Sequence, residues 1–149
     1  MSGIFTNFAA SNKSDVSVGP NGMSWLVYVN ELMNIEDYRE FCLSLGSDVE
    51  EKLPFAKFKN GEGVLVFYVA GHMFSFFDCN DFHVISLKCQ PERIPELREE
   101  YDCIGAPYNE SPKHWLGVNP HAATDQLLRD LTQNSYEIVK AKYIRKPRN

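Results

Sequence analysis

The residues of this sequence best suited to chemistry are lysines in segments that read as strands. Because side chains alternate between the two faces of a strand, Lys57 and Lys59 are expected on one face and Lys113 on the face of Trp115. If the face that carries Lys88 coincides with these, a small basic patch with an aromatic ring forms. Such a patch suits phosphate contact and base stacking. The candidate residues in this part of the chain are Lys57, Lys59, Lys88, Lys113, His114 and Trp115.

A plainer interpretation of the same residues stays open. The lysines would only solubilise a half-exposed sheet, and Trp115 would be part of the hydrophobic core. The net charge of -5 and the pI near 5.3 disfavour nonspecific attraction to phosphate backbones, because that attraction comes from clustered Lys and Arg. Any nucleic-acid site in this chain must therefore be local.

The last ten residues form a second basic group, with five basic and no acidic side chains. This tail could dock on phosphate or on an acidic partner, and a solvated C-terminus is the alternative. Its candidate residues are Lys140, Lys142, Arg145 and Lys146.

Catalytic and metal-binding patterns are missing from the sequence. The four histidines lack H-E-x-x-H spacing, the four cysteines form no C-x-x-C pair, and no G-x-S-x-G occurs. Strand alternation places Cys89 with Ile85 and Leu87, which predicts a buried, inert thiol. We expect no enzymatic activity, no metal and no cofactor.

Length and composition fit one globular domain in the cytoplasm. With 149 residues, 44% of them hydrophobic and 23% charged, the chain can bury one core. The start lacks the apolar run of a signal peptide, and the longest apolar stretch, residues 64–77, is interrupted by Gly71, His72 and Ser75. We therefore expect a soluble protein that is neither exported nor inserted in a membrane.

Residues 1–32 are predicted to be a flexible N-terminal extension of a single domain at residues 33–149. The first part is rich in Ser, Asn and Gly and shows no sustained period. Residues 25–29 could add an edge strand, or could be the unselected product of an upstream start codon. Met33 is a plausible true start.

The domain reads as an α+β fold with an antiparallel sheet of about five strands and three helices. Asn34 and Thr124 are good N-caps for the first and last helix. Residues 64–69 are apolar on both alternating faces, as in a central strand covered on both sides. The predicted order is a helix at 34–46, strands at 53–59, 64–70, 73–78 and 82–89, a helix at 91–101, a strand at 113–118 and a last helix from residue 124.

Several short motifs resemble the MmcQ/YjbR family. The strand ending Leu87-Lys88-Cys89 and the helix opening Pro91-Glu92-Arg93 match this family, together with Met33-Asn34-Ile35-Glu36, Lys113-His114-Trp115 and Ser135-Tyr136. The resemblance covers about residues 33–140. It departs from the family at Tyr108-Asn109-Glu110-Ser111-Pro112, where many members carry Tyr-His-Met-Asn.

The resemblance implies a CyaY-like fold, similar also to secretion chaperones, and a double-wing arrangement of hairpins that binds double-stranded DNA. The first hypothesis is therefore a non-enzymatic DNA-binding protein that contacts phosphates through its lysines. The alternative is a protein–protein or peptide interaction module without nucleic-acid activity, which an acidic surface tolerates better.

Overall fold

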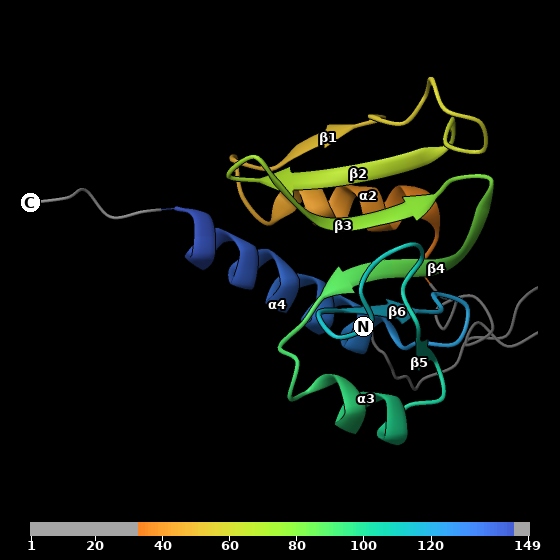
Figure 1. Cartoon of the computed structure of the whole chain (residues 1–149), viewed down its shortest axis with the longest axis vertical. Coiled ribbons are helices and arrows are strands. Elements are labelled where there is room, and N and C mark those ends of the chain that lie inside the picture. Colours follow the sequence, from red (N-terminus) through yellow and green to blue (C-terminus); the bar gives the residue numbers. More distant parts are fainter. Residues whose placement is uncertain (1–32, 145–149) are drawn as a thin grey trace, which may run out of the picture. The chain divides into compact units, whose positions relative to one another are not determined.

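The computed structural model describes residues 33–144 and shows the α+β fold expected from the sequence (Figure 1). One antiparallel sheet of six strands has the order β1-β2-β3-β4-β6-β5 and is accompanied by three helices. In chain order the elements are α2 (Ile35–Ser44), β1 (Glu50–Lys52), β2 (Val64–Val69), β3 (His72–Asp78), β4 (Asp81–Lys88), α3 (Ile94–Glu100), β5 (Ile104–Gly105), β6 (Trp115–Val118) and α4 (Asp125–Tyr143).

Both predicted N-caps are confirmed. The side-chain oxygen of Asn34 accepts a hydrogen bond from the Asp37 backbone N–H at 2.8 Å, and Thr124 Oγ1 accepts from the Leu127 N–H at 3.1 Å. Each cap satisfies one of the backbone donors that the first turn of a helix leaves unpaired. Helices α2 and α4 therefore begin where the sequence places them.

The helices α2 and α4 cover one face of the sheet. Figure 1 shows both helices behind the central strands. The main core lies between these layers, and its fully buried members include Tyr38 from α2, Phe67 from β2 and Leu128 from α4. The Tyr38 hydroxyl is hydrogen-bonded to Ser75 in β3 and to Thr132 in α4, which joins the two helices and the sheet.

Strand β2 is buried on both of its faces, as its sequence predicts. Phe67 and Val69 belong to the main core, whereas Val64 and Val66 belong to a second apolar cluster. Its hairpin with β3 turns through Ala70 and Gly71, which have φ of 53° and 78°. Two successive positive φ values match the twist of a two-residue hairpin.

The prediction of a strand at residues 53–59 is wrong. Strand β1 is Glu50–Lys52, and the chain then enters turns at Pro54 that last until β2 begins. Proline lacks the backbone N–H that a strand ladder needs. Lys57 and Lys59 therefore lie in a loop, and strand alternation does not place them on a common face.

The boundaries predicted after β4 also need correction. Ser111 O accepts hydrogen bonds from the N–H groups of His114 and Trp115, so residues 111–114 turn and β6 begins only at Trp115. The prediction that Lys113 and Trp115 share one face of a strand is therefore wrong. Helix α3 begins at Ile94 rather than at residue 91, and the two-residue strand β5 was not predicted.

None of the helices in residues 33–144 has the length and apolar character needed to cross a membrane. The predicted extension at residues 1–32, with its proposed strand at 25–29, lies outside the described part of the chain.

Candidate functional site

The face of the sheet opposite α2 and α4, here called the open face, carries a second apolar cluster. The cluster consists of Val64, Val66, Phe76 and Trp115, with the half-buried Tyr68 and Met73 packed against it. Its members come from β2, β3 and β6. Two loops, residues 53–63 and 106–112, contribute to a cleft on this face.

The first loop is held by its own backbone. Phe58 N donates to Phe55 O, and Gly61 N donates to Phe58 O, both at 3.0 Å. A Cβ on Gly61 would lie 2.5 Å from Phe55 O, so this turn requires glycine. The closed turn presents Phe55 and Phe58, which are 38% and 64% exposed, with ring centroids 6.5 Å apart and ring planes at 56°.

The second loop is fixed to the sheet through Ser86 and Gly117. The Tyr108 backbone N–H donates to Ser86 Oγ at 3.0 Å. Ala106 O occupies the space that a Cβ on Gly117 would need, so only glycine lets the loop lie this close to β6. The Tyr108 ring is left 46% exposed.

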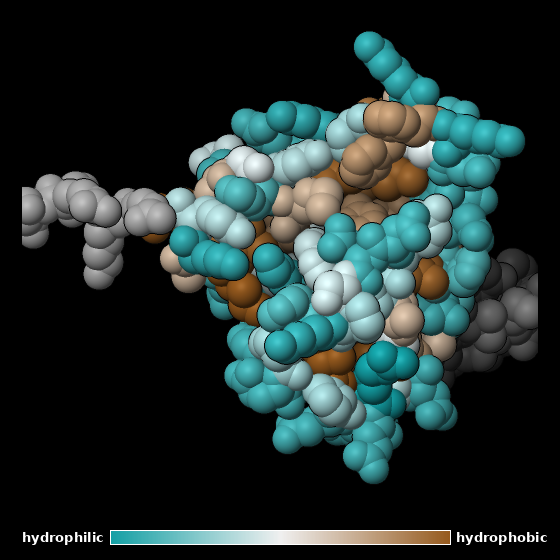
Figure 2. Space-filling model, in the orientation of Figure 1, coloured by the Kyte–Doolittle hydropathy of each residue, from teal (hydrophilic) through white to brown (hydrophobic). Residues whose placement is uncertain are grey.

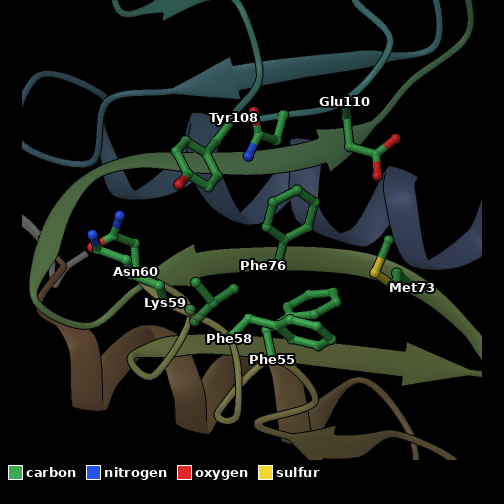
Figure 3. Close-up of a pocket in the computed structure, with 11 residues that line it drawn as sticks. Phe55, Phe58, Lys59, Asn60, Met73, Phe76, Tyr108 and Glu110 are labelled. Atoms are coloured by element: carbon green, nitrogen blue, oxygen red, sulfur yellow. The ribbon is translucent and has the colours of Figure 1, made fainter.

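A cleft of about 380 Å³ lies between the two loops, with Phe76 between its walls. Figure 3 shows Phe76 between Tyr108 and Glu110 on one side and Phe55 and Phe58 on the other. Figure 2 shows brown and tan apolar side chains around a hollow on a mainly teal surface. The full lining is Phe55, Phe58, Lys59, Asn60, Gly61, Val64, Met73, Phe76, Tyr108, Asn109 and Glu110.

The charged and polar side chains of the cleft are few and balanced. Lys59 and Glu110 are its one ammonium and one carboxylate, and Asn60 and Asn109 add amide groups that can donate and accept hydrogen bonds. A mainly aromatic cleft with a few polar groups is typical of sites that bind a small ligand or a side chain. Its balance of charge favours a neutral group.

Two of the predicted residues, Lys88 and Trp115, meet on the open face. The Lys88 ammonium lies 5.8 Å from the centre of the Trp115 ring, which packs edge-on against Phe76 at 5.6 Å. Trp115 is only 6% exposed, so its ring belongs to the sheet packing, as the plainer interpretation expects. Among residues 33–144, the exposed Phe and Tyr side chains are Phe55, Phe58 and Tyr108, all from the two loops.

The other predicted residues in the folded part lie elsewhere. Lys113 borders a separate hollow of about 420 Å³ beside Pro95 and Arg98 of α3. His114 is exposed, and its carbonyl accepts from Cys89 N at 3.0 Å.

The basic residues near the C-terminus are only partly described. Lys140 forms an ion pair with Asp48 at 3.0 Å and donates to the Tyr136 hydroxyl at 3.1 Å, so it already has protein partners. Lys142 lies over the Tyr143 ring at 5.2 Å. Arg145 and Lys146 lie outside the described residues.

Of the four cysteines, Cys42 and Cys89 are buried, Cys103 is half-buried and Cys79 is exposed. Burial is the main cause that raises the pKa of the thiols of Cys42, Cys79, Cys89 and Cys103. A raised pKa lowers the thiolate fraction at neutral pH, and the thiolate is the nucleophile and metal ligand. Within residues 33–144, no three His, Cys, Asp or Glu side chains are grouped as metal ligands would be.

The sequence analysis missed Phe55, Phe58 and Tyr108 as candidate site residues. The available signal was Pro54, which disfavours a strand, followed by the turn sequence at residues 60–63. Once residues 53–63 are taken as a loop, apolar rings inside it have no strand face to cover. Exposed aromatic side chains in a loop then become candidates for binding.

Two of the sequence motifs, Leu87-Lys88-Cys89 and Ser135-Tyr136, meet in the structure, where α4 is hydrogen-bonded to the end of β4. Ser135 Oγ accepts from the Lys88 backbone N–H at 2.9 Å and donates to Phe74 O at 2.5 Å, which ties α4 to β4 and β3. Asn134 donates to Gln90 Oε1 at 3.0 Å, directly after the Leu-Lys-Cys strand end. These motifs therefore fix the helix on the sheet and lie apart from the cleft.

Comparison with known proteins agrees with this fold. A Deinococcus radiodurans crystal structure, the DR2400 protein with a DUF419 domain, is 30% identical with a TM-score of 0.69, covering 77% of this chain and 84% of that one. A Pseudomonas syringae protein of known structure is 20% identical with a TM-score of 0.60, covering 72% of this chain and 99% of that one. No curated protein matches the chain. The sequence model of the YjbR family matches residues 45–138, and the chain belongs to the YjbR family.

Proposed function

We propose that this chain is a non-enzymatic nucleic-acid-binding domain whose ligand lies across the open face. The observation that carries the proposal is the loop Phe55-Ala56-Lys57-Phe58-Lys59, in which exposed rings and exposed lysines alternate beside the aromatic cleft. Lysines contact phosphates and aromatic rings contact bases. Lys88 extends the same face toward β6.

The charges of these lysines are available for a ligand. Within residues 33–144, no ion pair joins Lys57, Lys59 or Lys88 to a carboxylate, whereas Lys52 and Lys140 are both paired. An unpaired ammonium need not break an existing ion pair to contact a phosphate. The open face can therefore be locally attractive on a chain whose net charge is -5.

The burial of Cys42 and Cys89, which also raises the pKa of their thiols, supports the non-enzymatic part of the proposal. Two histidines are also engaged with aromatic rings: His72 stacks on Tyr143 at 3.4 Å and His121 packs edge-on against Phe82 at 6.0 Å. Neither has a neighbouring nucleophile in these contacts. Binding is thus better supported than catalysis.

The proposal is tested by fluorescence anisotropy of labelled oligonucleotides titrated with the chain at several salt concentrations. We expect log K to fall linearly with log salt, with each phosphate contact contributing about -0.9 for duplex DNA and about -0.7 for single strands. Lys57→Glu with Lys59→Glu should abolish binding at physiological salt. Arg98→Glu with Arg129→Glu, which makes the same change of charge on the exposed surfaces of α3 and α4, is the matched control and should change the affinity little. No binding at low salt would refute the proposal.

A peptide-binding module is the second candidate, because the 64% exposure of Phe58 beside an apolar cleft also suits a protein partner. The two candidates differ in salt dependence. Binding of an apolar peptide anchor would persist at high salt and in the lysine variants, since burial of apolar surface does not release counterions.

A further inference from the structure

The aromatic cleft differs from a simple phosphate-binding surface. A duplex keeps its bases stacked inside, so contacts to its backbone need cations and hydrogen-bond donors rather than exposed phenyl rings. Here Phe55, Phe58 and Tyr108 project from two loops on either side of Phe76 (Figure 3). Exposed rings on both walls of a cleft suit a flat aromatic group placed between the walls.

The geometry points to an unpaired base of a single-stranded nucleic acid as the group that enters this cleft. This inference rests on the proposed function and identifies the form of nucleic acid that the open face takes. A base offers aromatic faces to the rings and polar edges to the rim, whereas double-stranded DNA offers neither without opening.

The size and lining of the cleft support this occupant. A volume of about 380 Å³ lies at the lower end of the range of about 300 to 1,000 Å³ found for ligand sites. The opposite charges of Lys59 and Glu110 favour a neutral group with polar edges over a carboxylate or an ammonium. A base meets both conditions, and its own backbone phosphates would lie near Lys57 and Lys59 in the adjoining loop.

The rim gives an expectation about base preference. A carboxylate accepts hydrogen bonds from the exocyclic amino group of cytosine, and thymine has no such donor. Glu110 is the carboxylate on the rim, at the wall formed by residues 106–112 (Figure 3). Cytosine strands should therefore bind more tightly than thymine strands, and Glu110→Gln should reduce the difference.

The charge of the chain also favours stacking as a source of affinity. With a net charge of -5, long-range attraction to phosphate is weak, so binding needs a contribution that does not depend on charge. Base–aromatic stacking supplies such a contribution, equivalent to about 5- to 140-fold in Kd for each base. Single strands should thus show a shallower salt dependence than a wholly electrostatic ligand of the same length.

The test compares a fluorescein-labelled single strand of about 12 nucleotides with the duplex of the same sequence, using the full chain. We expect the single strand to bind at least about tenfold more tightly. Phe58→Ala and Tyr108→Ala, from opposite walls, should each weaken single-strand binding about 5- to 140-fold. Leu53→Ala is the control, since Leu53 is an exposed apolar residue of the same loop that does not line the cleft.

A further variant separates stacking from general apolar contact. Phe58→Leu keeps an apolar side chain but removes the aromatic face, so it should behave like Phe58→Ala if a base stacks there. Wild-type affinity in Phe58→Leu would overturn the inference. Duplex binding equal to or tighter than single-strand binding would overturn it while leaving the proposed function standing. Absence of binding to both ligands would overturn both.

Discussion

The two faces of the sheet differ in what covers their aromatic residues. On the helix-covered face, Phe67, Phe74 and Phe77 are buried beneath α2 and α4. On the open face, Phe55, Phe58 and Tyr108 come from loops and keep between 38% and 64% of their surface exposed. Burial of apolar surface stabilises the fold, whereas exposed rings contribute little to it. The helix-covered face therefore holds most of the buried core, whereas the loops of the open face leave rings exposed to solvent, where the proposed ligand would bind.

The polar contacts of the two faces show the same division. Behind the sheet, the Tyr38 hydroxyl and Ser135 Oγ each serve two partners in the interior. In the cleft, Asn60, Asn109 and Glu110 lie at a surface where water can reach them. Satisfied buried groups specify a unique packing, and accessible groups can exchange water for a ligand.

The largest expected effect is on the helix-covered face. Phe67→Ala should lower the free energy of unfolding by about 3–5 kcal/mol, because it removes a fully buried ring and leaves a cavity. Urea denaturation measures this change. Phe55→Ala, on the open face, is the control, and an equal loss in both variants would refute the division between the faces.

A smaller effect is expected at the link between α4 and the sheet. Ser135→Ala removes the hydroxyl that bonds the Lys88 N–H and the Phe74 carbonyl, and it should cost about 1–3 kcal/mol of stability. Ser44→Ala, which loses only a local bond to Phe41 O on the helix surface, should cost much less. Equal unfolding midpoints for the two variants would show that the buried link is unimportant.

Asp48 should make stability depend on acid pH. The hydrogen bond from Tyr136 and the ammonium of Lys140 lower the pKa of the Asp48 carboxyl in the folded state. A lowered folded pKa stabilises the fold above the unfolded value of about 3.9, and this contribution is lost as pH falls through the folded pKa. The stability difference between wild type and Asp48→Asn should therefore shrink as pH falls below about 4. A difference that stays constant from pH 7 to pH 2 would contradict this assignment.

The smallest expected effect on stability is at the cleft. Phe58→Ala should change the free energy of unfolding by less than about 0.5 kcal/mol, since surface substitutions seldom exceed that value. The same variant is expected to weaken binding of a single strand. Thermal unfolding beside the anisotropy titration would sharpen the comparison, and a loss of several degrees in Tm would place Phe58 in the core instead.

The pattern of the sequence predicted the helix-covered half of the molecule well. Asn34, Thr124 and the apolar periodicity of the two helices are local signals, as is the two-sided apolar pattern of residues 64–69. Caps and periodicity depend on neighbours within a few residues, so they are readable without the fold. The motif resemblance to the YjbR family was confirmed for the same reason, because short motifs are local.

The candidate site was predicted less well. The lysines were assigned to faces by strand alternation, and this argument failed at Lys57, Lys59 and Lys113, since those residues lie in turns. At Lys113 the strand boundary was misplaced by two residues, whereas at Lys57 and Lys59 the whole predicted strand is a loop, and alternation holds only inside a strand. Trp115 was proposed as a stacking residue, but the sheet buries it against Phe76.

The sequence by itself determined the α+β class, the starts of α2 and α4, and the hairpin of β2 with β3. Only the tertiary structure decided that Tyr108 faces Phe58 across Phe76, since the two residues are about 50 positions apart in the sequence. The loop that carries Tyr108 is held in place by the hydrogen bond from Tyr108 N to Ser86 Oγ and by the close approach of Ala106 to Gly117. Those contacts are long-range, and no local pattern encodes which loop meets which. The physical reason is that the cleft is a property of packing between segments, whereas caps, turns and periodicity are properties of the segments themselves.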